Sequence, residues 1–181
     1  ADAEILAMTV ECLLATGLTE FQVSVGQVDY YKAIFAQTGL SQEEEEELRE
    51  LISQKNYFGV EELVKNKNMD KSLARVLSQL PQMFGSTEVL EKAKSLTDNP
   101  QALKAVARLE EIYELLKVYG YEKYVTFDFA MLSKYHYYTG VIFKAFSYGV
   151  GDAIVKGGRY DKLLGCFGKS APAIGFAVVI D

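Results

Sequence analysis

The spacing of apolar residues changes twice along this chain. Near its start, Phe21, Val23 and Val25 alternate with polar or small residues, a period of two that is typical of a strand with one buried face. Helical spacing precedes this strand at residues 2–16, where Met8, Cys12 and Leu13 are predicted to face the core, and follows it from residue 28 to about residue 37. The first part of the chain is therefore predicted to form a helix, a strand and a short helix.

The middle of the chain carries helical signals only. Ser41 with Glu44 three residues later has the pattern of a capping box, and Asp70 stands where it can cap a further helix. Asn99 followed by Pro100 is typical of the N-cap and first position of a helix. We expect four or five short helices in a compact insert over residues 39–119.

After Gly120 the period of two returns, which predicts more strands. Val125 and Phe127 alternate with polar residues in the first of them. Antiparallel pairing is expected because the following segments are joined by short, glycine-containing loops. The later elements are expected as a strand over 141–148, a tight loop over 149–151, a strand over 152–156, a helix from near 160 and a strand over 173–180.

Composition narrows the possible roles of the chain. The 19 basic and 25 acidic residues give a net charge of −6 with no basic cluster, so a nucleic-acid partner is not expected. No apolar run approaches the roughly 20 residues of a membrane span. Cys12 and Cys166 lie in unrelated segments and the chain has one histidine, so neither a zinc site nor a disulfide framework is indicated, and a reducing cytoplasm fits best. The ends at Ala1 and Asp181 are expected to be those of a fragment.

Two short segments carry the candidate chemistry. Tyr137 and Tyr138 enter the strand that begins at Val141, so they are predicted to point to opposite faces of the sheet, where at most one can line a given pocket. They can equally be ordinary sheet aromatics. The Gly-Gly-Arg-Tyr-Asp segment over 157–161 suits a close backbone approach to a ligand, or simply a turn before a helix. His136 has no partner at metal-ligand spacing, so neither metal binding nor another cofactor is expected.

Together these segments resemble the ordered signatures of the histidyl-tRNA synthetases. The signatures fall at residues 137–143, 157–168 and 172–181. The resemblance implies an α+β fold, with the antiparallel sheet of the class II aminoacyl-tRNA synthetase catalytic fold and an all-helical insert. It divides the chain into a first part of the synthetase-like core at residues 1–38, the helical insert at 39–119 and a second part of the core at 120–181.

The departures from the synthetase pattern concern catalysis. Synthetases carry Arg-Gly-Leu-Asp before the paired tyrosines, and the arginine assists attack on the α-phosphate of ATP. Here the four positions are Ser133, Lys134, Tyr135 and His136, and a serine cannot supply a guanidinium. Lys144 stands where the synthetase has a glutamate. Adenylation of histidine is therefore expected to be lost or very weak.

In these departures the chain is similar to the synthetase paralogues that serve as regulatory subunits of ATP phosphoribosyltransferase, in the first step of histidine biosynthesis. The resemblance implies a non-catalytic homodimer that joins the short catalytic subunit, is required for its activity and takes part in feedback inhibition by histidine. Tyr138 and Tyr160 match tyrosines that approach the histidine imidazole, and Gly157, Gly158 and Arg159 accompany them as pocket candidates. The alternatives are a catalytic fragment of a divergent histidyl-tRNA synthetase and a protein-interaction module on an inert scaffold.

Overall fold

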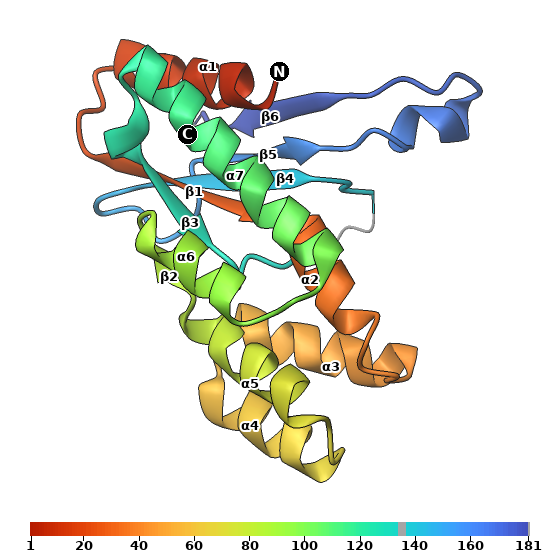
Figure 1. Ribbon diagram of the computed structural model, residues 1–181. Helices are drawn as coiled ribbons and strands as arrows, with labels where there is room; N and C mark the ends of the chain where they lie inside the picture. The colour runs from red at the N-terminus through yellow and green to blue at the C-terminus, as the bar shows by residue number, and fades with distance from the viewer. Residues whose placement is uncertain (134–136, 181) are drawn as a thin grey trace.

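The computed structural model describes residues 1–133 and 137–180 as a six-stranded sheet crossed by helix α7, with a helical lobe at one end (Figure 1). Among these residues, no helix combines the length and the apolar character that a membrane crossing requires. The elements in chain order are α1 (Asp2–Ala15), β1 (Phe21–Gln27), α2 (Val28–Phe35), α3 (Gln42–Ser53), α4 (Tyr57–Asn66), α5 (Lys71–Gln79), η1 (Leu80–Gln82), β2 (Phe84–Gly85), α6 (Glu88–Ser95), α7 (Pro100–Tyr119), η2 (Glu122–Tyr124), β3 (Val125–Asp128), β4 (Val141–Ser147), β5 (Val155–Arg159), η3 (Leu163–Phe167) and β6 (Ile174–Val178).

The strands lie in the order β2-β3-β1-β4-β5-β6. All neighbouring pairs are antiparallel except β1 and β3, which run parallel with Val23 opposite Val125. The predicted α+β class is confirmed, and the sheet is mixed rather than purely antiparallel. Parallel neighbours need a long crossover connection, and the helices between β1 and β3 provide it.

The helical middle contains the predicted caps. Ser41 and Glu44 form a complete capping box on α3, the Asp70 carboxylate caps α5, and the Asn99 side chain accepts two backbone hydrogen bonds at the start of α7. Gly120 ends α7 with a φ of +74°, a left-handed conformation that favours glycine. Helices α3, α4 and α5 form the lobe below the sheet in Figure 1.

The predicted insert is not helical throughout, because it contributes strand β2 to the sheet. Phe84 pairs with Asp128 on β3, and the Phe129 amide donates a 2.9 Å hydrogen bond to the Met83 carbonyl. A strand of two residues is too short to show a period of two, so the sequence pattern could not reveal it.

One continuous core joins the three predicted parts of the chain. Helix α7 packs against α1, α2 and β1, and its buried residues belong to the same cluster as those of the sheet. The division at residues 38 and 119 therefore has no counterpart in the packing and stays a prediction. The buried residues of α7 are Ala102, Ala105, Val106, Leu109, Ile112 and Leu116.

The last third of the chain departs most from expectation. Strand β5 begins at Val155, so residues 148–154 form a longer connection than the tight loop predicted. Gly157 and Gly158 lie inside β5 rather than in a turn after a strand, and the helix predicted from Tyr160 is the short 3-10 helix η3. A glycine pair is uncommon within a strand, so it marks a place where other groups approach the backbone closely.

Candidate functional site

The strand register divides the sheet into two different faces. Val25 pairs with Phe143 on the face that supplies the core, where both side chains are almost fully buried. On the opposite face, Ser24, Lys144 and Lys156 follow one another across β1, β4 and β5. Alternate residues of a strand share a face, so this polar face also carries Gly158.

Glycines on the polar face make room for tyrosine rings. A Cβ at Gly158 would lie 2.6 Å from Cε1 of Tyr138, and one at Gly175 would lie 3.2 Å from the Tyr160 hydroxyl. A Cβ at Gly157 would instead meet the Phe143 ring at 2.5 Å, on the other face. Each glycine of the pair thus admits an aromatic ring against the backbone of β5, which explains why both stand inside a strand.

Three tyrosines form a cluster next to these glycines. The rings of Tyr137 and Tyr138 lie 4.5 Å apart between centroids, and Tyr137 meets Tyr160 edge-on at 6.2 Å. The prediction that Tyr137 and Tyr138 point to opposite faces is wrong, because both precede β4 and do not follow its alternation. The structure brings the predicted pair Tyr138 and Tyr160 together with Tyr137 between them.

Helix α2 helps to hold this tyrosine segment in place. The Lys32 ammonium donates a 3.1 Å hydrogen bond to the Tyr138 carbonyl, and the Val28 amide donates one of 2.9 Å to the Gly140 carbonyl. Burial lowers the pKa of Lys32, and the nearby Asp29 carboxylate acts in the opposite direction. The start of α2 and the entry to β4 are therefore fixed to each other.

A cavity of about 320 Å³ opens beside Tyr138. This volume is at the lower end of the range for small-molecule sites. Of the predicted site residues, Tyr138 and Gly157 line it, whereas Tyr160, Gly158 and Arg159 are not among the described residues of its wall. The wall consists of Ser53, Met131, Leu132, Ser133, Tyr138, Ile142, Phe143, Lys144, Lys156 and Gly157.

Arg159 belongs to an ion-pair network on the helix-covered side. Its Nε and Nη2 donate to Oδ1 of Asp2 at 2.8 and 2.5 Å, and its Nη1 donates to Asp161 at 2.9 Å. Arg108 on α7 donates to the second oxygen of Asp2 at 2.8 and 3.1 Å. All three guanidinium nitrogens of Arg159 thus donate to protein carboxylates. This geometry does not support ligand binding by Arg159, which stays a prediction.

Asp161 links this network to the tyrosine segment through its backbone and to the start of β6 through its carboxylate. Its Oδ1 accepts a hydrogen bond of 3.1 Å from the Ala173 amide, and its own amide donates one of 3.0 Å to the Thr139 hydroxyl. The Gly-Gly-Arg-Tyr-Asp segment is therefore a scaffold that joins β5, β6 and the entry to β4. Sequence reasoning missed this role because Asp2, its main partner, is 157 positions away from Arg159.

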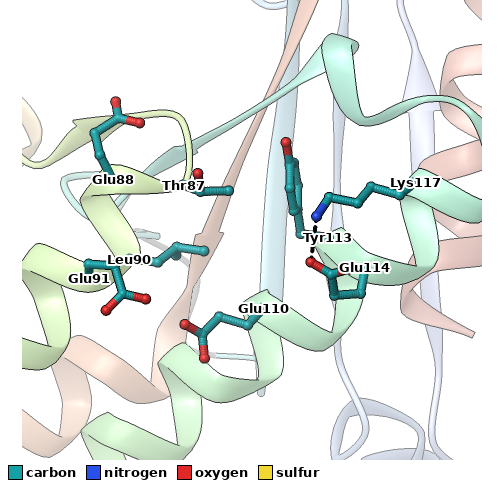
Figure 2. Close-up of a pocket in the computed structure, with 8 residues that line it drawn as sticks. All are labelled: Thr87, Glu88, Leu90, Glu91, Glu110, Tyr113, Glu114 and Lys117. Atoms are coloured by element: carbon teal, nitrogen blue, oxygen red, sulfur yellow. Dashed lines mark hydrogen bonds and ion pairs between the residues drawn. The ribbon is translucent and has the colours of Figure 1, made fainter.

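A larger pocket between α6 and α7 is a weaker candidate (Figure 2). Its volume is about 440 Å³ and its wall is rich in glutamates. Lys94 pairs with Glu91 and Glu110 at 2.7 and 2.6 Å, and Lys117 pairs with Glu114 at 2.6 Å. In the described part of the chain no three metal-ligating side chains come together, and His136 lies outside the described residues.

A family model described as histidyl-tRNA synthetase matches residues 1–181 of this chain. The chain belongs to this family. It is 43% identical over 181 residues to the ATP phosphoribosyltransferase regulatory subunit of Acetivibrio thermocellus, of which it covers 43%. The chain spans about half the length of the curated relatives it matches.

Solved structures of the same family share the fold. A Bacillus halodurans protein described as an ATP phosphoribosyltransferase regulatory subunit/histidyl-tRNA synthetase has a TM-score of 0.90 and 34% identity, over 98% of this chain and 47% of that chain. The Nostoc histidyl-tRNA synthetase has a TM-score of 0.82 over 98% of this chain and 44% of its own, and its 22% identity carries the fold alone. The synthetase-like core predicted from the motifs is confirmed.

Family membership gives Ser133 its significance. The resemblance to the synthetase signature sets position 133 against its arginine, and the structure places Ser133 in the same cavity wall as Tyr138. The described wall of the cavity thus contains the Tyr138 ring and the Ser133 hydroxymethyl group. The other replaced positions, Lys134, Tyr135 and His136, lie outside the described residues.

Proposed function

We propose that this chain is part of a non-catalytic regulatory subunit of ATP phosphoribosyltransferase that works in the cytoplasm. The observation that carries the proposal is 43% identity over the whole chain to a protein of that name. The subunit pairs as a homodimer and joins the short catalytic subunit. It is required for the activity of that subunit and takes part in feedback inhibition by histidine.

The cavity supports a binding role without aminoacylation. Tyr138 offers a ring face and a hydroxyl, which suits the edge of a small heterocycle such as imidazole. Adenylation needs a cation placed where charge develops on the α-phosphate, and Ser133 offers none. Gly158 lies directly against the ring of Tyr138, and Tyr160 supports that ring through Tyr137. Both residues therefore help to hold the pocket wall in place.

Feedback through such a subunit needs an effector that binds two assembly states with different affinity. A coupling free energy of about 1–3 kcal/mol changes the affinity of the partner site by roughly 5- to 150-fold. The tyrosine segment is connected to α2 through Lys32 and to β5 and β6 through Asp161. A ligand that moves Tyr138 therefore acts on α2 and on the segment that joins β5 to β6.

The test is reconstitution of the full-length protein with the short catalytic subunit. We expect phosphoribosyltransferase turnover to rise when the two are mixed, and added histidine to lower it. Tyr138→Ala should weaken the effect of histidine, while Tyr148→Ala, a change of a fully solvated tyrosine on the 148–154 connection, serves as the matched control. A mixture whose turnover equals that of the catalytic subunit alone overturns the proposal.

The second candidate is histidyl-tRNA synthetase activity, which the double description of the Bacillus halodurans neighbour favours. It predicts histidine-dependent exchange of pyrophosphate into ATP by the full-length protein. Our proposal predicts no such exchange. Clear exchange, or charging of tRNA, would decide for the synthetase.

A further inference from the structure

Two lysines stand directly opposite each other on the polar face of the sheet. Lys144 on β4 pairs in register with Lys156 on β5, and both line the cavity beside Tyr138. Like charges directly opposite each other on neighbouring strands are destabilising. The repulsion between the two ammonium groups is offset when a ligand places a negative charge between them.

The surroundings of the pair leave its charge largely uncompensated. No carboxylate is among the described residues of the cavity wall. Lys156 has an ion pair with Asp152 at 3.1 Å, and Lys144 also attracts this carboxylate, but the Asp152 side chain is 81% exposed, so solvent screens both interactions. Among the described residues, no ion pair within 4 Å involves Lys144. In a chain with a net charge of −6, this part of the surface is locally positive.

Hydroxyl groups continue the row on the other side of Lys144. Ser24 on β1 is the register partner of Lys144, and its hydroxyl lies 3.2 Å from that of Thr126 on β3. The row Thr126, Ser24, Lys144 and Lys156 thus crosses four strands with two hydroxyls followed by two ammonium groups. Hydroxyl and ammonium groups are the donors that phosphate oxygens accept from.

We propose that Lys144 and Lys156 form an anion site for the phosphate group of a small molecule whose remaining part lies in the cavity against Tyr138. Phosphate carries a charge of about −1.5 to −2 at pH 7, which matches two ammonium groups, whereas a single carboxylate would leave one of them unmatched. The glutamate of the synthetase signature would repel such a group at position 144. This site lies in the cavity of the proposed function but does not depend on the regulatory role.

The probes are inorganic phosphate and pyrophosphate, titrated into the full-length protein at low salt and followed by calorimetry and by thermal unfolding. We expect pyrophosphate to bind more tightly than phosphate and to raise the melting temperature. Lys144→Gln and Lys156→Gln should each weaken binding by about 10-fold or more, since each removes a charged hydrogen-bond donor. Lys92→Gln, at an exposed lysine on α6, is the matched control and should bind as the wild type does.

Without ligand, the two variants should melt at the wild-type temperature or above it, because each relieves the repulsion between the lysines. This readout separates loss of binding from loss of folding. Wild-type protein that binds neither probe, or variants that bind as tightly as the control, would overturn the inference. A protein that activates the catalytic subunit yet binds no pyrophosphate would refute the anion site and leave the regulatory proposal standing.

Discussion

Replacing Asp2 with asparagine removes the negative charge that holds two arginines from different elements. The Asp2 side chain is 3% exposed, and its oxygens accept hydrogen bonds from Arg108 on α7 and Arg159 on β5. Burial acts to raise the pKa of this carboxyl, but the hydrogen bonds and charges of both guanidinium groups outweigh it and hold the pKa below its usual value. The ionised form of Asp2 therefore stabilises the fold.

The size of the effect follows from how buried each partner is. Removing one member of a fully buried ion pair costs about 3–5 kcal/mol. The side chains of Arg108 and Arg159 are 43% and 20% exposed, and each keeps a second carboxylate, Glu111 and Asp161 respectively. Solvent screening and these remaining partners reduce the cost, so we expect Asp2→Asn to lower the free energy of unfolding by about 2–3 kcal/mol. For a cooperative folding unit of this size the melting temperature should fall by about 4–12 °C.

The assay is urea and thermal unfolding of both proteins at several pH values. Because the pKa of Asp2 is lower in the folded state, its stabilisation is fully present above the unfolded pKa, near 4, and is lost as the pH falls through the folded pKa. The difference between wild type and Asp2→Asn should be largest near neutral pH and shrink below about pH 4. Glu4→Gln, an exposed carboxylate in the same helical turn, should change stability by less than about 0.5 kcal/mol. An Asp2→Asn effect no larger than this control, or one independent of pH, would refute the reasoning.

Three further predictions concern Gly158 beneath the Tyr138 ring, the Asn99 cap of α7 and the side chain at position 133. Gly158→Ala should destabilise by about 1–3 kcal/mol in urea unfolding, since its Cβ would lie 2.6 Å from the Tyr138 ring. Gly165→Ala, with open space around its Cβ, is the control and should stay within about 0.5 kcal/mol. Asn99→Ala should lower the free energy of unfolding by about 1 kcal/mol, because two backbone amides of α7 lose their acceptor. Ser133→Arg should produce no histidine-dependent pyrophosphate exchange, because Lys144 also departs from the synthetase pattern.

Each of these expectations has an outcome that contradicts it. Equal stability of the Gly158→Ala and Gly165→Ala proteins would mean that the Tyr138 ring does not rest on the backbone. An Asn99→Ala protein as stable as the wild type would show that solvent replaces the cap at no cost. Exchange activity in the Ser133→Arg protein would mean that the cavity still holds ATP and histidine in a reactive arrangement.

Helix boundaries were predictable because their causes lie within a few residues. The capping box at Ser41, the Asn99-Pro100 start and the Gly120 end each depend on atoms three or four positions away. The face of α1 was predicted only in part, since Leu13 is buried as expected. Met8 and Cys12 were expected to face the core, yet both are exposed, while Leu6 and Val10 are buried. The direction a helix faces is set by what packs on it, and α7 is more than eighty residues away in sequence.

By itself, the sequence determined the class of the fold, most of the helices, and the presence of the tyrosine and glycine motifs. Only the tertiary structure decided how those motifs are used. It placed Gly158 under Tyr138, directed Arg159 to Asp2 and away from the cavity, and set Lys144 opposite Lys156. The physical reason is the distance along the sequence over which each interaction acts. Capping and periodicity act between near neighbours, whereas close packing, burial of charge and strand register depend on residues that only folding brings together.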